Sequence, residues 1–278
     1  MGDQVKISDE NAAQFHEEGY TMCPNFFDAE ETEALQAEVM RFRREGLLRN
    51  VATAGDGRTT SEDEANLQRV GLTPISTLFR SLPYEPRVID AVERLIGNPL
   101  VLHLDQVFLK PAGHGAGTSW HTDNAYFQIA DPLKGTAMWI AVHDANVSNG
   151  TLRVIPKGFR ETYDHTRDPN SDHHIRFYPD ESSAVACELE AGGVVFFCYG
   201  TPHSTGANAS DADRAGVGLH FLRTDFVPES YGDERWGNLA HLTGPDATGG
   251  LTEHGVTVAG TWRDEVERAR QTVVVSKD

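Results

Sequence analysis

Hydrophobic and polar residues follow two different patterns along this chain of 278 residues. In three stretches between residues 8 and 98 the apolar positions recur every three or four residues, which is the spacing of amphipathic helices. Ser8 and Asp28 are suitable N-cap residues, and Gly97 is a suitable helix end. The pattern predicts helices over residues 11–18, 29–45 and 85–96.

From residue 99 to residue 228, short apolar runs rich in β-branched and aromatic residues are separated by turn-forming residues. Asn149-Gly150 is a strong signal for a hairpin turn, and it precedes a run that Pro156 ends. A second turn, Ala191-Gly-Gly193, separates two further runs. The predicted strands cover residues 136–142, 151–155, 187–190, 194–198 and 214–222.

These patterns predict one domain over residues 1–278 with three parts. A hydrophobic content of 39% is sufficient for a large core. The glycine-rich tail ends in a short predicted helix over residues 261–270 and receives no role beyond packing or partner contact. The expected parts are a helical annex at 8–98, a β core at 99–228 and a C-terminal extension at 229–278.

The candidate metal-binding residues lie in the β region, in the tripeptide His121-Thr-Asp123 and at His203. On a strand, residues two positions apart point to the same side, so His121 and Asp123 can share a metal with a distant third ligand. Two imidazoles and one carboxylate hold Fe(II) on one face and leave the other positions open. Arg214 follows His203 as a possible counter-ion for an anionic cosubstrate.

Other histidines of the chain offer rival ligands. His103 and Asp105 form a second pair with the same spacing, but no matching downstream partner follows them. The segment from residue 161 to 180 contains His165, His173 and His174. We expect this segment to be a solvated insertion, of the kind that often carries substrate contacts, rather than a source of further metal ligands.

Several motifs of the chain together resemble the phytanoyl-CoA dioxygenase family of Fe(II)/2-oxoglutarate-dependent oxygenases. The resemblance runs from about residue 10 to residue 228, and it includes residues 18–27 and Leu109-Lys-Pro111. The other motifs that carry it are Trp120-His-Thr-Asp123, Trp139-Ile-Ala-Val-His-Asp144, Asn149-Gly150, Val154-Ile-Pro156, Glu190-Ala-Gly192 and His203-Ser-Thr-Gly-Ala-Asn208 with Arg214.

The resemblance implies a mainly β fold, a double-stranded β-helix (a cupin-like jelly roll) with an N-terminal helical annex. Carried over by position, it implies catalytic iron ligands at His121, Asp123 and His203. It implies that Arg214, assisted by Thr205, binds the distal carboxylate of 2-oxoglutarate, and that O₂ is the second cosubstrate. Further cosubstrate contacts implied in the same way are Trp139, Gln106 and Arg69.

Two features narrow the expected substrate. Related halogenases have a small residue where this chain has Asp123, so oxygen transfer, desaturation or oxidative cyclisation is expected. With 24 Lys+Arg against 42 Asp+Glu, the net charge of −18 repels polyanions such as nucleic acids and the phosphates of acyl-CoA. An acidic composition can also have the sole role of keeping a protein in solution, without any relation to its substrate. We expect a polar or sugar-containing small molecule of secondary metabolism, as in antibiotic biosynthesis.

Three alternatives stay open at this point. The chain could be an acyl-CoA hydroxylase, the activity for which the family is named. It could also be a metal-binding cupin-like protein that does not use 2-oxoglutarate, or a catalytically silent β-domain used for binding. Release of CO₂ that depends on 2-oxoglutarate separates the expected oxygenase from the last two.

The sequence also predicts the cellular location and the binding partners of the protein. It lacks an 18-residue apolar run and an apolar signal region, so neither membrane insertion nor export is expected. Its three cysteines are an odd number without metal-like spacing, which fits the reducing cytoplasm. The expected partner is a small-molecule substrate and no nucleic acid, and the oligomeric state is left open.

Overall fold

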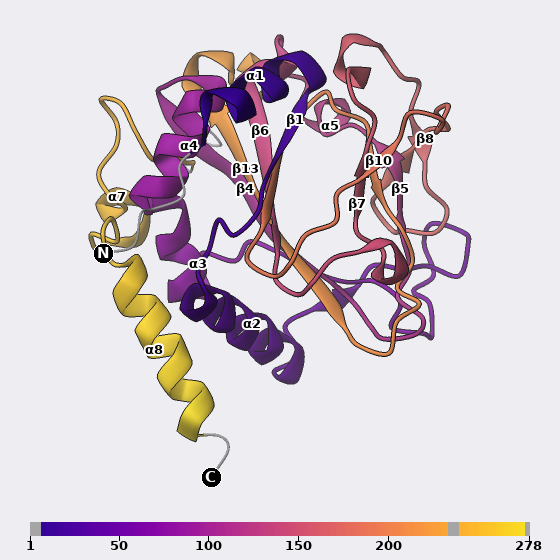
Figure 1. Cartoon of the computed structure of the whole chain (residues 1–278), viewed down its shortest axis with the longest axis horizontal. Helices are drawn as coiled ribbons and strands as arrows, with labels where there is room; N and C mark the ends of the chain where they lie inside the picture. The colour runs from indigo at the N-terminus through magenta and orange to yellow at the C-terminus, as the bar shows by residue number, and fades with distance from the viewer. Residues whose placement is uncertain (1–6, 233–238, 276–278) are drawn as a thin grey trace.

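Two antiparallel sheets face each other, and helices pack against the outer side of the larger one (Figure 1). The structure, a computed structural model, describes residues 7–232 and 239–275. The large sheet has the order β1-β11-β6-β13-β4-β3-β2, with β14 also paired to β4. Its strands are β1 (Tyr20–Cys23), β2 (Arg49–Asn50), β3 (Leu67–Val70), β4 (Leu100–Lys110), β6 (Gly135–Ala141), β11 (Val194–Cys198), β13 (Arg214–Arg223) and β14 (Ala240–His241).

The smaller sheet has the order β10-β7-β12-β5, and a two-stranded ribbon, β8-β9, lies beside it. This arrangement confirms the predicted mainly β, double-stranded β-helix fold. The strands concerned are β5 (Thr118–His121), β7 (Leu152–Val154), β8 (Thr166–Arg167), β9 (Ile175–Arg176), β10 (Val185–Ala186) and β12 (His203–Thr205).

The predicted helices form close to their expected boundaries because their caps are local. The side chains of Ser8 and Asp28 each accept a hydrogen bond from the third residue of the helix that follows, and Gly97 ends a third helix. The α-helices are α1 (Asp9–Glu18), α2 (Ala29–Arg44), α3 (Thr77–Ser81), α4 (Pro86–Ile96), α5 (Asn124–Phe127), α7 (Leu251–His254) and α8 (Trp262–Val275). Short 3-10 turns are η1 (Leu82–Tyr84), η2 (Pro132–Lys134), η3 (Val147–Asn149), η4 (Gly158–Arg160), η5 (Thr224–Phe226) and η6 (Glu229–Tyr231).

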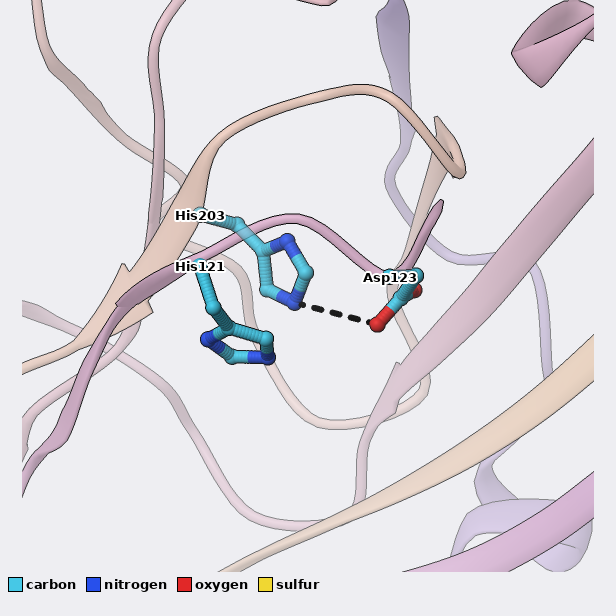
Figure 2. Close-up of side chains that lie close together, drawn as sticks. All are labelled: His121, Asp123 and His203. Carbon is cyan, nitrogen blue, oxygen red and sulfur yellow. Dashed lines mark ion pairs between the residues drawn. The ribbon is translucent and has the colours of Figure 1, made fainter. Parts of the chain in front are cut away.

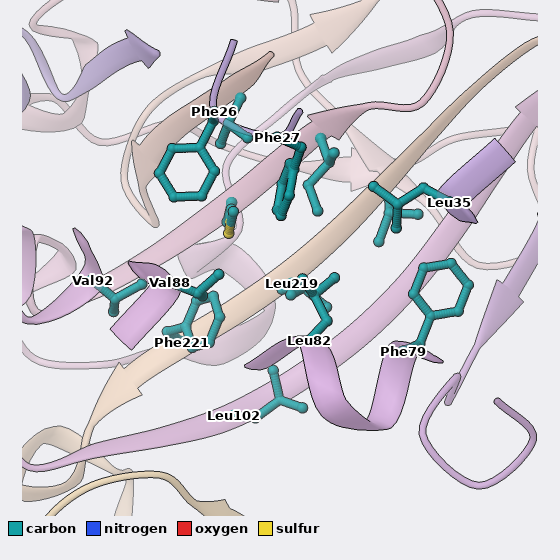
Figure 3. Close-up of a cluster of buried hydrophobic side chains, with 14 of the residues drawn as sticks. Phe26, Phe27, Leu35, Phe79, Leu82, Val88, Val92, Leu102, Leu219 and Phe221 are labelled. Carbon is teal, nitrogen blue, oxygen red and sulfur yellow. The ribbon is translucent and has the colours of Figure 1, made fainter. Parts of the chain in front are cut away.

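Side-chain alternation along the strands of the large sheet divides the interior into two cores. On β6, Met138 and Ile140 face the helices, whereas Trp139 faces the small sheet. Figure 3 shows the core on the helix side, where residues of α2, α3 and α4 meet residues of β4 and β13. The second core, between the sheets, leaves room at one end for the cavity described below.

The C-terminal helix α8 is attached through a buried ionic group. Glu31 of α2 is fully buried, pairs with Arg87 at 2.7 Å and accepts a hydrogen bond from the indole of Trp262, also at 2.7 Å. A buried carboxylate is tolerated only with such partners. The C-terminal helix α8 therefore packs against the helical layer. Packing against the rest of the protein was one of the two roles expected for the tail.

Two local expectations were wrong. The residues Asn149-Gly150 do not form a hairpin: they end η3, with Gly150 at φ +76°, and the strands on either side, β6 and β7, belong to different sheets. The helical annex at 8–98 also contributes β1, β2 and β3 to the large sheet. Both differences depend on pairings between distant segments, which local patterns do not specify.

Candidate active site

Pairing between β5 and β12 brings His121 and His203 together, because they are direct partners across the two strands. Asp123 follows β5 and has right-handed helical backbone angles just before α5, so it lies at the strand edge rather than on the strand itself. The three side chains nevertheless converge, as Figure 2 shows. Their ligand atoms all lie within 4.8 Å of one another, and His203 Nε2 is 3.7 Å from Asp123 Oδ1.

The backbone orients both imidazoles for metal binding. Nδ1 of His121 donates to the Ser119 carbonyl at 2.8 Å, and Nδ1 of His203 donates to the Thr201 carbonyl at 3.0 Å. With the Nδ1 proton fixed in this way, each Nε2 presents a lone pair to the group. Burial lowers the pKa of His121 to about 4 and the pKa of His203 well below its ordinary value, so both rings are neutral ligands.

Asp123 is the anionic member of the group. It is 5% exposed, and burial raises the pKa of its carboxyl to about 8. A cation between the three side chains would offset this cost, because opposite charge favours the ionised form. Two neutral imidazoles and one carboxylate match the ligand set of non-haem Fe(II), so the residues present fit that metal.

A chain of polar side chains from the large sheet leads to the second oxygen of Asp123. Gln68 donates to Gln106 at 2.9 Å, and the amide of Gln106 lies 3.0 Å from His220 Nε2. Nδ1 of His220 faces Asp123 Oδ2 at 3.5 Å. Sequence patterns gave His220 no role at the site, since a single histidine in an apolar strand carries no local signal.

The metal group opens into a cavity of about 220 Å³ between the two sheets. At one end of it lie two cations, Lys110 and Arg214, each only 1% exposed. Arg214 donates to the carbonyls of Asn149 and Gly150. Lys110 donates to the Thr205 hydroxyl at 2.7 Å and to the Gly206 carbonyl.

Neither cation forms an ion pair with an Asp or Glu side chain within residues 7–232 and 239–275. Burial lowers the pKa of Arg214 to about 10, and burial together with the charge of Arg214 lowers the pKa of Lys110 well below its ordinary value. Two buried like charges are unfavourable unless an anion lies between them. The two cations are therefore suited to bind an anion such as a carboxylate, and sequence patterns did not single out Lys110.

The structure brings most of the predicted cosubstrate residues to this cavity. Thr205 and Gln106 line it, and Trp139 lies 5.8 Å below the guanidinium of Arg214. Arg69 is not among the lining residues, because side chains alternate on β3 and its neighbours Gln68 and Val70 take the cavity side.

The rival pair His103 and Asp105 has a different role. Asp105 accepts hydrogen bonds from the backbone amides of Leu72 and Thr73, both at 3.0 Å, and so fixes the chain after β3. His103 packs between Tyr199 and Tyr231. Among the described residues, the grouping of three side chains that could hold a metal is His121, Asp123 and His203.

The model of the phytanoyl-CoA dioxygenase (PhyH) family matches residues 15–216, which include the three candidate ligands and Arg214. The chain belongs to the phytanoyl-CoA dioxygenase family. This confirms the predicted family and enzyme class, a non-haem Fe(II)/2-oxoglutarate-dependent dioxygenase. The predicted cofactors, Fe(II) and 2-oxoglutarate, are confirmed with it.

Known proteins similar to this chain differ in their reactions. Ectoine dioxygenase of Bordetella bronchiseptica is 22% identical over 81% of this chain and 79% of its own length. The epimerase SnoN, solved with Fe3+, alpha ketoglutarate and nogalamycin RO, is 21% identical with a TM-score of 0.65 over 87% of this chain and 91% of its own. EctD from S. alaskensis, solved with 2-oxoglutarate and 5-hydroxyectoine, is 20% identical with a TM-score of 0.63 over 81% and 79%. At such identities the two structures show a common fold.

The search for membrane-spanning segments, limited to the described part of the chain, found no helix with the length and apolarity needed to cross a bilayer.

Proposed function

We propose that His121, Asp123 and His203 hold the Fe(II) of this dioxygenase and that Lys110, Thr205 and Arg214 bind the distal carboxylate of 2-oxoglutarate. The observation that carries this proposal is a pair of buried cations in the same cavity as the metal group, for which the described residues provide no carboxylate partner. A cupin-like metalloprotein without an anionic cosubstrate would have no reason to keep two unpaired cations there.

When bound, iron supplies the oxidising chemistry: 2-oxoglutarate, O₂ and a substrate C–H bond give succinate, CO₂ and an oxidised product. The residues of the chain supply binding and placement. Arg214 offers a planar fork for a carboxylate, and Lys110 adds a point charge. Thr205 Oγ1 accepts hydrogen bonds from Lys110 and from the Thr118 amide, so its own proton is free to donate to the same carboxylate.

We propose that the substrate is a polar or sugar-containing small metabolite of secondary metabolism, oxidised by hydroxylation, desaturation or ring closure. Support comes from SnoN and the carbocyclase SnoK, both described as enzymes of nogalamycin biosynthesis, although the ectoine dioxygenases show that relatives also act on other small solutes. Acyl-CoA fits less well, because both cations that line the cavity are buried at its cosubstrate end and are not available for phosphates.

The test is production of succinate by the purified protein with Fe(II) and 2-oxoglutarate, measured with small glycosylated metabolites, ectoine and acyl-CoA thioesters. The proposal is supported if one compound gives a product with the mass of its oxidised form, in an amount equal to the succinate formed. If only acyl-CoA increased succinate formation, the result would favour an acyl-CoA hydroxylase, the activity for which the family is named. Absence of 2-oxoglutarate consumption under every condition would contradict the assignment of the site.

A further inference from the structure

A second group of histidines lies against the metal ligands, on the segment that carries β8 and β9. The Tyr126 hydroxyl accepts a hydrogen bond from the Ile175 amide at 2.9 Å, and the Phe177 amide donates to the Trp120 carbonyl at 3.0 Å. Nε2 of His165 accepts a hydrogen bond at 3.2 Å from the amide of Thr122, which lies between His121 and Asp123 in the sequence. The segment that was expected to be a solvated insertion therefore forms a wall of the cavity, and these hydrogen bonds hold it against the metal ligands.

His174 is the central side chain of this wall. It lines the cavity, is 8% exposed, and holds its ring nearly parallel to the ring of His121, with 6.4 Å between the centroids. In the part of the chain that the structure describes, neither ring nitrogen of His174 has a hydrogen-bond partner. Because His174 lines the cavity and its ring nitrogens are accessible from it, they can bind a ligand there.

His173 supports His174 and also lines the cavity. Its ring contacts His174 edge to face at 4.1 Å. Its Nδ1 lies 2.6 Å from the carboxylate of Asp172, which also pairs with Arg49. Donation from Nδ1 to Asp172 fixes the tautomer, so Nε2 of His173 is an acceptor. The wall thus offers hydrogen-bonding nitrogens in fixed orientations.

Formal charge is confined to other parts of this cavity. Of its described lining residues, those with a formal charge are Asp123 in the metal group and Lys110 and Arg214 at the cosubstrate end. The remaining wall, on the side of His173 and His174, is formed by apolar and aromatic side chains with a few amides and hydroxyls. A charged substrate group would lose its hydration there without direct contact with a charged side chain among the described lining residues.

We propose that His174, backed by His173, is the side chain that recognises the substrate, and that it binds a hydroxyl or carbonyl group on a neutral part of the molecule. This inference rests on the proposed function, because it concerns the substrate of the same site. The expected substrates are therefore neutral molecules that carry hydroxyl groups or sugars. Carboxylate, ammonium or phosphate groups next to the carbon that reacts are excluded.

The first test compares two substitutions at one position. His174→Phe keeps a flat ring and removes both hydrogen-bonding nitrogens, whereas His174→Gln keeps a donor and an acceptor. The exposed His114, on a turn of the chain, provides the matched control His114→Phe. Metal content and 2-oxoglutarate affinity are measured in all three and should equal the wild-type values, since His174 contacts neither proposed carboxylate-binding cation.

The second test uses anthraquinone glycosides and simple aryl glycosides as neutral probes, with ectoine and palmitoyl-CoA as charged ones. Succinate formation by the wild type should rise with neutral probes that carry a hydroxyl and much less with their O-methyl derivatives. His174→Phe should lower kcat/KM for an accepted probe by about 10- to 100-fold, and His174→Gln should recover part of it. His114→Phe should behave as the wild type.

Two outcomes would overturn the proposal. One is equal kcat/KM for His174→Phe and the wild type on an accepted probe. The other is failure of every neutral probe while the protein still binds 2-oxoglutarate in a metal-dependent manner, whether or not a charged probe is accepted. Because 2-oxoglutarate binding is measured separately, loss of that binding in the wild type would instead count against the proposed function.

Discussion

Nδ1 of His220 faces Oδ2 of Asp123 at 3.5 Å, although the two residues lie on different elements, β13 and the start of α5. Neither atom has a hydrogen-bond partner among the described residues. Since the Gln106 amide donates to His220 Nε2, the ring proton is left on Nδ1, on the side of the ring that faces the carboxylate. Groups of this kind hold a metal-binding carboxylate in place and tune its affinity.

Replacement of His220 should therefore weaken metal binding without removing a ligand. His220→Phe should lower the affinity for Fe(II) by about 10- to 100-fold, and His220→Asn, which keeps a donor near Nδ1, should lose less. The measurement is anaerobic metal titration of the purified variants. If His220→Phe and the wild type bound Fe(II) equally, His220 would have no part in positioning Asp123.

Substitutions at the cosubstrate end should affect 2-oxoglutarate and leave the metal unchanged. Arg214→Lys loses the planar fork, and Lys110→Met loses one of the two cations, so each should weaken 2-oxoglutarate binding by about 10- to 100-fold. Binding calorimetry and metal analysis on the same samples check this. Unaltered affinity in both variants would place the carboxylate elsewhere in the protein.

Lys110→Met also tests stability, because it removes a buried amino group for which the described part of the chain offers no counter-ion. The free energy of unfolding of the protein without 2-oxoglutarate should not fall in this variant, and its Tm should be at least that of the wild type. A large loss of stability would show that Lys110 serves the fold rather than the cosubstrate.

The ionic group that holds α8 gives a prediction for the fold. Glu31→Ala leaves Arg87 buried without its carboxylate and removes the acceptor of the Trp262 indole. Unfolding in denaturant should show a loss of about 3–5 kcal/mol. The exposed residue Glu33, which pairs with Arg270 on the same two helices, provides the control: Glu33→Ala should cost about 0–1 kcal/mol. Similar losses for both would contradict the account.

Sequence patterns predicted the parts of this protein that depend on neighbouring residues. Ser8 and Asp28 cap their helices through side-chain contacts three residues away, and short apolar runs rich in β-branched and aromatic residues mark the buried strands. Asn149-Gly150 was misleading because turn chemistry does not specify to which sheet the next strand belongs. The motif resemblance placed His121 and His203, but local patterns could not reveal that they are cross-strand partners.

The residues that sequence reasoning missed depend on tertiary structure in the same way. Lys110 reaches the cosubstrate end because β4 pairs with β13 so that Lys110 lies opposite Arg214. His174 is buried because the β8-β9 ribbon folds back onto the flanks of His121. Neither the register of distant strands nor the docking of an irregular segment has a signature in local composition.

The central claim is that one cavity holds both the metal and the anionic cosubstrate, so their binding must be linked. The most direct measurement is the affinity for 2-oxoglutarate, determined by calorimetry without O₂, in the presence and absence of Fe(II) and in Asp123→Ala. The account predicts that removing the metal, or replacing Asp123, weakens 2-oxoglutarate binding by about tenfold or more. Equal affinity for 2-oxoglutarate under all three conditions would contradict it.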